Sequence, residues 1–218
     1  QVVVPHPKFL VDVGGIDPGF AATLACSGIT VYSAIQKIMP LPPDEPVVLM
    51  GAGGLGLAAI AMLRALDHRH IISIDRHPAK AEAALQMGAS HFVDGSQPDL
   101  PQRILALTQG PVKAVIDLVN HSSTASVGLE LLQKNGKLVL VGVGGGEIVL
   151  SLASMIFRPR TVQGSVTGAP SDLRAVAALA QSGKLRPIPI TRMAKDQANQ
   201  ALHLLEQGQV QGRIVLEG

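Results

Sequence analysis

Cysteine, aromatic residues and charge are all scarce in this chain of 218 residues, and each scarcity excludes a class of protein. Cys26 is the one cysteine, so no internal disulfide can form, and a cytoplasmic location is expected. The chain has no Trp, one Tyr and four Phe, and its formal net charge is +2. It lacks the basic patch and the stacking aromatics that nucleic-acid binding usually requires, so no nucleic-acid partner is expected.

Uninterrupted apolar segments are also missing. The longest stretches without a charged residue, 18–36 and 46–63, are both broken by glycines. A membrane-spanning helix needs about 20 predominantly apolar residues, so we expect no membrane partner.

What the sequence does contain is a regular alternation of short β-branched runs with longer segments of helical period. This alternation is typical of βαβ units with a parallel sheet that is buried on both faces. It predicts a doubly wound α/β fold with six strands. The predicted strands are residues 47–50, 71–74, 91–93, 114–118, 137–141 and 161–164, and the helices between them are residues 55–66, 78–87, 100–107 and 122–132.

The two ends of the chain do not follow this rhythm. Residues 18–39 are expected to be helical in their second half and are closed by a proline-rich linker at 40–46. After the sixth strand we expect helices at 171–181 and 196–206 and a last strand at 213–216. We interpret both ends as parts of a second, incomplete domain, with residues 2–4 and the last strand as remnants of its sheet.

A glycine-rich turn follows the first predicted strand. Residues 51–56 read Gly-Ala-Gly-Gly-Leu-Gly, which is a Gly-x-Gly-x-x-Gly pattern between a strand and a helix. Gly51 would permit the tight turn, Gly53 the close approach of a pyrophosphate, and Gly56 the packing of the helix on the sheet. The pattern predicts a dinucleotide site, and Gly54 lies within the same loop.

An acidic residue in the right place supports this prediction. Asp75 ends the second predicted strand, where a carboxylate would accept hydrogen bonds from an adenosine ribose and repel a 2′-phosphate. NAD is therefore favoured over NADP, although the neighbouring Arg76 weakens the preference, and Lys80 could also reach the ribose. The pattern alone also fits an S-adenosylmethionine methyltransferase or a short-chain dehydrogenase. The latter is disfavoured because Tyr32 is followed four residues later by Gln36 rather than by a lysine.

Several segments together resemble the zinc-dependent alcohol dehydrogenases of the medium-chain dehydrogenase/reductase superfamily. They are Ala-Cys-Ser-Gly-Ile-Thr-Val-Tyr-Ser-Ala at 25–34, the glycine loop, Asp75, Leu-Val-Leu-Val-Gly-Val at 138–143, Val-Gln-Gly-Ser at 162–165 and Gly-Gln-Val-Gln-Gly-Arg-Ile-Val at 208–215. The resemblance covers essentially the whole chain. It implies a Rossmann domain at 28–166, with parts of a GroES-like catalytic domain at 1–27 and 167–218.

The resemblance also implies site residues. Cys26 matches the third protein ligand of a catalytic zinc, which polarises the substrate oxygen. Thr30 matches a residue that contacts the nicotinamide ring, and Leu55 matches one that packs near it. The backbones of Val141 and Ser165 match positions that bind the carboxamide. Arg213 would then pair with the pyrophosphate.

The first two zinc ligands of that family precede the matched region, and this chain opens with Gln1 rather than Met. We therefore expect a fragment of an NAD-dependent alcohol dehydrogenase that acts on a small alcohol or carbonyl substrate, is inactive by itself, and forms a dimer or tetramer. Two alternatives stay open. One is a zinc-independent quinone or enone reductase, in which Cys26 is incidental, and the other is a non-catalytic NAD-binding module.

Overall fold

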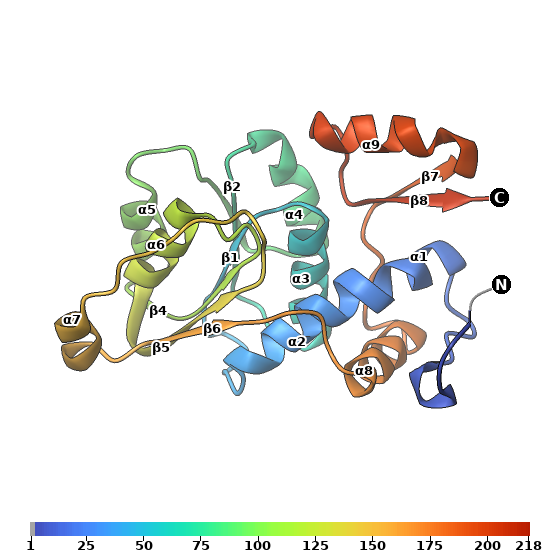
Figure 1. Cartoon of the computed structure of the whole chain (residues 1–218). Helices are drawn as coiled ribbons and strands as arrows, with labels where there is room; N and C mark the ends of the chain where they lie inside the picture. Colours follow the sequence, from blue (N-terminus) through green and yellow to red (C-terminus); the bar gives the residue numbers. More distant parts are fainter. Residues whose placement is uncertain (1–2) are drawn as a thin grey trace.

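The computed structural model describes residues 3–218, and its largest feature is a six-stranded sheet in which every neighbouring pair of strands is parallel (Figure 1). The strand order is β3-β2-β1-β4-β5-β6, the order of a doubly wound sheet, so the predicted fold class is confirmed. The strands are β1 (Val47–Met50), β2 (Ile71–Asp75), β3 (His91–Asp94), β4 (Val112–Asp117), β5 (Leu132–Leu140) and β6 (Thr161–Gly164).

Helices cover both faces of this sheet, and each face has its own apolar core. The connecting helices are α3 (Gly54–Ala65), the short turn η3 (Pro78–Lys80) with α4 (Ala81–Met87), α5 (Leu100–Leu107) and α6 (Ser122–Leu131). On β1, Val47 and Leu49 belong to one core, and Val48 and Met50 to the other. Successive side chains of a strand point to opposite faces, which explains why this strand is apolar throughout.

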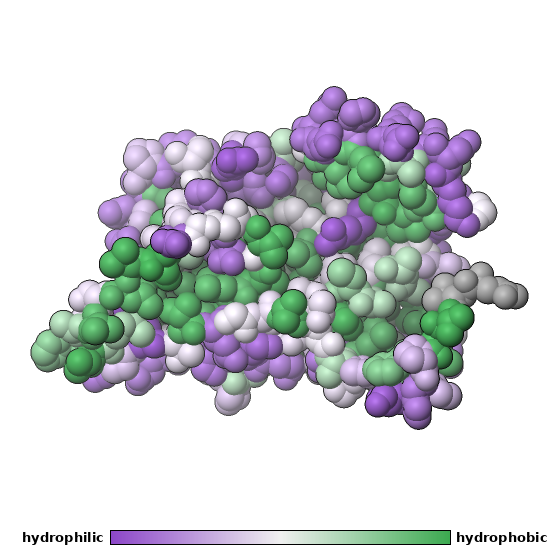
Figure 2. All heavy atoms as spheres, viewed as in Figure 1, coloured by the Kyte–Doolittle hydropathy of each residue, from purple (hydrophilic) through white to green (hydrophobic). Residues whose placement is uncertain are grey.

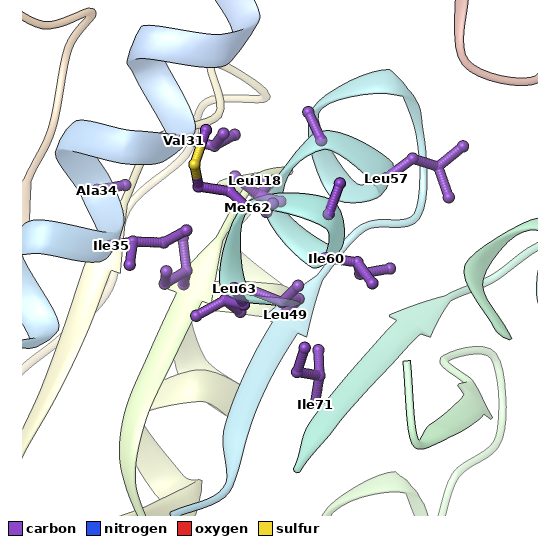
Figure 3. Close-up of a cluster of buried hydrophobic side chains, with 14 of the residues drawn as sticks. Val31, Ala34, Ile35, Leu49, Leu57, Ile60, Met62, Leu63, Ile71 and Leu118 are labelled. Carbon is purple, nitrogen blue, oxygen red and sulfur yellow. The ribbon is translucent and has the colours of Figure 1, made fainter. Parts of the chain in front are cut away.

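The larger core lies between the sheet and two helices, α3 and α2 (Ile29–Ile38). Figure 3 shows Val31 and Ile35 of α2 and Met62 and Leu63 of α3 pointing toward one another above Leu49 of β1. All five side chains are at most 1% exposed. Because α3 begins at the glycine loop, this packing also fixes the position of that loop on the sheet.

The helix α2 continues an apolar helical run that begins with α1 (Pro18–Thr23) and the π-helical segment η2 (Leu24–Gly28). The whole run, Pro18–Ile38, is long and apolar enough to cross a membrane by length and composition, but 56% of its most apolar window is buried inside the protein. The core helix of a globular protein passes the same test. Contacts of α2 with α3, α8 (Pro170–Gln181) and β5 identify it as such a helix.

The C-terminal region forms a small separate sheet. Its elements are β7 (Ile190–Ala194), the turn η4 (Lys195–Gln197), α9 (Ala198–Glu206) and β8 (Arg213–Glu217), and β7 and β8 pair in parallel. Arg192 of β7 donates two hydrogen bonds, 2.7 and 2.8 Å long, to the carboxylate of Asp17 just before α1. A Cβ on Gly19 would lie 2.8 Å from the same guanidinium group, so the arginine side chain packs closely on this glycine.

Three parts of the sequence prediction need correction. The expected strand at residues 2–4 does not form at residues 3–4, and residue 2 lies outside the described part of the chain. Two elements were not anticipated: β7, whose side chains are half-buried or exposed, and α7 (Leu152–Phe157), which is only six residues long. The fifth strand is also longer than predicted, because β5 begins at Leu132, within the segment Leu132–Gly136 that lacks an apolar pattern. A short turn, η1 (Pro7–Phe9), precedes α1.

Candidate functional site

The strand ends that carry the predicted site residues lie level with one another. The end of β1, Met50, pairs with Ile74 on one side and with Asp117 on the other. Asp117 in turn pairs with Leu140, and Leu140 pairs with Gly164. The residues that follow these strands therefore line one edge of the sheet, the carboxyl edge, where doubly wound folds bind their ligands.

Each of the three motif glycines in the loop is explained by a different feature of the structure. Gly51 has φ +103°, a left-handed conformation that favours glycine, and its N–H donates to Ile74 O at 2.7 Å. A Cβ on Gly56 would lie 2.1 Å from Gly51 O, so the helix could not approach the turn. Around Gly53, by contrast, a Cβ would meet nothing within 4 Å. This side of the loop is open for a ligand to approach the backbone, and Gly53 is the residue that precedes α3.

Asp75 is held beneath this loop by the protein's own donors. The residue is 9% exposed, and its carboxylate accepts hydrogen bonds from Ala52 N (2.9 Å), His77 N (3.0 Å) and Lys80 Nζ (2.9 Å). Burial raises the pKa of Asp75, but the three donors outweigh burial and hold the pKa below its ordinary value. The residue is therefore a carboxylate at neutral pH, and it also fixes the backbone of the glycine loop through Ala52.

Two cations flank this carboxylate in different ways. Lys80 forms an ion pair with Asp75 and is itself partly buried, whereas Arg76 is exposed and its Nε lies 3.3 Å from His77 Nε2. The structure thus brings Asp75, Arg76 and Lys80 together beside the glycine loop. Their predicted contacts with a ribose stay predictions.

Arg213, from the far end of the sequence, lies against the same loop. A Cβ on Gly54 would come 2.5 Å from Gly212 O and 2.7 Å from Arg213 Nε. The backbone N–H of Arg213 donates to Pro189 O at 3.0 Å, which ties the start of β8 to the segment before β7. The side-chain Nε of Arg213 is buried without a hydrogen-bond partner. An unpaired buried guanidinium nitrogen next to a predicted diphosphate cradle is suited to an anionic ligand.

Cys26 faces a cleft that it shares with Arg213. The thiol is exposed on η2, and Thr30 follows one helical turn later, buried at the start of α2. The cleft is open, has a volume of about 360 Å³, and is lined by Ala22, Thr23, Cys26, Ser27, Arg213, Ile214, Val215 and Leu216. The structure therefore places the thiol near the residue that lies against the glycine loop, although the two are 187 positions apart in the sequence.

The remaining predicted contacts lie at the ends of β5 and β6 and at the start of α3. The N–H of Val141 donates to Asp117 O (2.9 Å) and that of Ser165 donates to Leu140 O (2.8 Å). Only the carbonyl groups of these two residues are thus available for a predicted carboxamide contact. Ser165 is 8% exposed as a residue, and its hydroxyl is buried without a hydrogen-bond partner. Leu55 is half-buried against the larger core.

A metal centre is not assembled by the described residues alone. Within residues 3–218, no group of three or more His, Cys, Asp or Glu side chains lies close enough to hold a metal ion. A catalytic zinc needs three protein ligands, and Cys26 supplies one thiolate. The residues present do not fit a complete zinc site, and the role of Cys26 as a ligand stays a prediction.

Sequence reasoning missed one polar cluster at the carboxyl edge. Asp117, Asn120 and Thr124 join the turn after β4 to the turn after β5 through side-chain hydrogen bonds. An Asp that ends a buried apolar strand and is followed by Asn three residues later was the available signal. It follows the same logic that identified Asp75.

Comparisons with known proteins agree with this geometry. A family model described as zinc-binding dehydrogenase matches residues 54–182. An NAD-dependent alcohol dehydrogenase of Sulfurisphaera tokodaii is 36% identical over 217 residues, which is 99% of this chain and 62% of that protein. The D-arabinose 1-dehydrogenase (NADP(+)) of Saccharolobus solfataricus is 32% identical over 220 residues, with the same two coverages.

Among solved structures, the alcohol dehydrogenase of Aeropyrum pernix superimposes with a TM-score of 0.83 at 32% identity. It covers 90% of this chain, and the chain covers 57% of it. This chain therefore spans about six-tenths of the length of the proteins that it matches.

Proposed function

Because the chain belongs to the zinc-binding dehydrogenase family, we propose that it is the cofactor-binding part of an NAD-dependent alcohol dehydrogenase, which transfers hydride between a small alcohol or carbonyl substrate and NAD. The observation that carries the proposal is the glycine loop. Gly51 and Gly56 are required by the fold itself, whereas Gly53 leaves a part of the backbone open at the carboxyl edge. Such an opening above a helix N-terminus suits the diphosphate of a dinucleotide.

The residues around the loop would orient the two halves of the cofactor. Asp75, with Lys80 and Arg76 beside it, lies on the β2 side of the loop and would hold the adenosine ribose. Arg213, which lies against the loop at Gly54, would pair with the diphosphate through its guanidinium group. When bound, the nicotinamide ring would accept or donate the hydride, and the protein would supply binding and orientation.

The opposite half of the site would receive the nicotinamide. We assign Thr30 and Leu55 to the ring, and the carbonyls of Val141 and Ser165 to its carboxamide. Cys26 faces the cleft beside these elements and would serve as one ligand of a zinc ion. Since the other ligands are not among the described residues, we assign no catalytic step to zinc and expect no alcohol turnover by this chain alone.

The proposed domain division follows the same assignment. Residues 28–166 would form the NAD-binding domain, and residues 1–27 and 167–218 would belong to the catalytic domain. The first boundary falls within the continuous helical run Pro18–Ile38, so the two parts would share a rigid connection. A cytoplasmic location belongs to this proposal, because an exposed thiol such as Cys26 is kept reduced there.

The test of cofactor binding is a titration of the chain with NADH. Because the protein has no Trp, the emission of NADH can be followed directly without energy transfer from the protein. We expect a saturable rise in emission that ADP-ribose reverses by competition. No saturable change up to about 1 mM NADH, a concentration that detects binding of about −4 kcal/mol, would contradict the proposal.

The proposed homo-oligomer would form at the edge strand β6. This strand ends the sheet, and within residues 3–218 nothing pairs with its outer side. Large apolar side chains are exposed nearby on α7, including Ile156 and Phe157, and Figure 2 shows apolar surface gathered over this end of the molecule. A second copy could extend the sheet across a two-fold axis and cover these side chains.

We expect sedimentation equilibrium to give twice the 22.7 kDa mass of one chain. The double variant Ile156→Lys/Phe157→Lys should sediment as a monomer, because it places two charges in the contact. The matched control is Leu202→Lys/Leu205→Lys, which alters two exposed leucines on α9 and should stay dimeric. A monomeric wild-type chain, or a control that dissociates equally, would refute this interface.

A further inference from the structure

Two histidines lie side by side at the amino edge of the large sheet, which is the edge opposite the candidate site. His70 immediately precedes β2, and His91 is the first residue of β3. The centroids of their rings are 6.0 Å apart. The glycine loop and Asp75 lie at the other ends of these strands, so the proposed function has no use for either ring.

The strand register places both imidazoles on one face of the sheet. His91 pairs with Ile72, and residues that pair across parallel strands point to the same face. His70 lies two residues before Ile72, and its carbonyl accepts a hydrogen bond from Val47 N at 3.0 Å, so the strand pairing continues back to His70. Side chains two residues apart in a strand also share a face. Both rings therefore extend the row of Ile72, which belongs to the apolar core on the side of α5 and α6.

A serine fixes the backbone beside both rings. Ser90 N donates to Ile71 O at 2.8 Å, and the hydroxyl of Ser90 accepts from Ile71 N and donates to Ile71 O, both at 2.8 Å. Ile71 follows His70, and Ser90 precedes His91. These hydrogen bonds thus join the neighbours of the two histidines, and such preorganisation reduces the entropy that a ligand must overcome on binding.

One imidazole nitrogen at this edge is buried without a hydrogen-bond partner among the described residues. It is Nδ1 of His91, a residue that is half-buried as a whole. A proton on a buried nitrogen without an acceptor is unfavourable, so the tautomer with the proton on Nε2 is favoured and Nδ1 keeps its lone pair. A buried lone pair of this kind calls for a partner, such as a water molecule or an ion.

The spacing of the two rings fits a single metal ion between them. An imidazole nitrogen binds Zn²⁺ at about 2.0–2.1 Å and lies about 1.1 Å from its ring centroid, so one ion can join centroids up to about 6.4 Å apart. The observed 6.0 Å is within this reach. The charge at this edge is also suitable. Because α5 connects the parallel strands β3 and β4, it runs back along the sheet and ends at the amino edge, where the carbonyl end of a helix favours a cation.

We propose that His70 and His91 bind a divalent transition metal ion of the class that prefers imidazole ligands, which includes Cu²⁺, Ni²⁺ and Zn²⁺. Within residues 3–218 no third His, Cys, Asp or Glu side chain joins them, so water completes the coordination. The ion links the start of β2 to the start of β3. It should therefore raise the melting temperature of the chain, because it binds the folded state, in which the two rings are held together.

The test is a calorimetric titration of Cu²⁺ into the chain. Cys26→Ser is introduced into every protein compared, because a thiolate also binds copper. We expect this parent chain to bind one Cu²⁺ ion more tightly than Ni²⁺ or Zn²⁺, as the usual order of affinities for these ions requires. His70→Gln and His91→Gln should each weaken Cu²⁺ binding at least about tenfold, because each removes one of the two protein ligands.

A matched variant and a spectrum identify the ligands independently. His203→Gln alters a histidine that is exposed on α9, with its Nδ1 3.3 Å from Glu206 Oε2, and should leave the affinity for Cu²⁺ unchanged. The electron paramagnetic resonance spectrum of the copper-loaded parent chain should show coupling to two imidazole nitrogens. This measurement needs no substitution at either ligand, so it tests the site even if His91→Gln fails to fold.

The outcomes separate this site from the proposed function. A loss of affinity in both ligand variants, with the affinity kept in His203→Gln and two coupled nitrogens in the spectrum, supports the site. The site is wrong if the parent chain binds no stoichiometric Cu²⁺ up to about 1 mM, or if either ligand variant binds as the parent does. An equal loss in His203→Gln, or coupling to a single nitrogen, overturns it as well. NADH binding is measured on the same proteins and tests the proposed function separately, because the cofactor would lie at the opposite edge of the sheet.

Discussion

Replacing Gly53 with Ala should weaken dinucleotide binding and leave the melting temperature unchanged, whereas replacing Gly56 with Ala should destabilise the whole protein. Gly53 has φ −77° and ψ −165°, a conformation open to any residue, and a Cβ there meets nothing within 4 Å. The added methyl group would occupy the space in which the diphosphate approaches the backbone. We expect NADH affinity to fall at least tenfold, which is about 1.4 kcal/mol.

In Gly56→Ala the methyl group meets protein rather than ligand. Its Cβ would lie 2.1 Å from Gly51 O, and neither backbone segment can move away without disturbing β1 or α3. Overpacking of this severity should lower the free energy of unfolding by about 3 kcal/mol, which is the upper end of the usual range. For a domain of this size that corresponds to a fall of roughly 10 °C in melting temperature.

Calorimetry of both variants with and without NADH measures the two effects separately. Each variant is the control for the other, because both add one methyl group to the same loop. If Gly53→Ala bound NADH normally, the open side of the loop would not be the diphosphate site. If both variants lost stability equally, the distinction between ligand space and packing would be wrong.

The sequence was sufficient to predict the fold wherever burial imposes a simple pattern. Strands such as Val47–Met50 are apolar on every residue because both faces of the sheet are covered. The edge strand β6 is half-buried or exposed, and it was located from its place in the alternation of strands and helices. The pattern was insufficient for β7, because its side chains are half-buried or exposed. It was also insufficient for α7, where large apolar side chains such as Phe157 are exposed rather than buried.

The candidate site was likewise predictable only where a local sequence pattern records a structural requirement. Gly51 and Gly56 could be predicted because a tight turn and a close helix approach each exclude a side chain, and local spacing records both requirements. The contact of Gly54 with Arg213 depends on how β8 returns to the loop, which no local pattern encodes. Asp117 was missed for another reason: it ends a buried strand as Asp75 does, but Asp75 was singled out by its place in the dinucleotide motif that begins with the glycine loop, and Asp117 belongs to no such motif.

The second large effect is expected at Asp75, where the same side chain would serve the protein and the cofactor. Asp75→Ser removes a carboxylate that binds Ala52 N, His77 N and Lys80. NADH affinity should fall about 10- to 100-fold, because hydrogen bonds to a charged group contribute about 1.5–3 kcal/mol. NADPH affinity should rise relative to NADH, since the repulsive charge is gone and Lys80, released from its ion pair, can bind a 2′-phosphate together with the exposed Arg76.

Stability should respond to the same substitution in a pH-dependent way. The folded pKa of Asp75 lies below its ordinary value of 3.8, so the carboxylate stabilises the fold above that pH and loses its contribution as the pH falls through the folded pKa. Wild type and Asp75→Ser should therefore differ in melting temperature at neutral pH and converge in strong acid. A difference that is constant with pH would mean that the charge of Asp75 contributes nothing.

The decisive comparison is between the two aspartates that end neighbouring strands. Asp94 ends β3 as Asp75 ends β2, and the two residues are register partners, but Asp94 receives its hydrogen bonds from Ser96 and Gln97 in an exposed turn rather than from the glycine loop. Asp94→Ser should leave the affinities for NADH and NADPH unchanged. If Asp75→Ser also left both unchanged, its carboxylate would serve only the loop, and the ribose would have to lie elsewhere. If it weakened both cofactors equally, the loss would come from the Ala52 contact, and the preference for NAD would need another source.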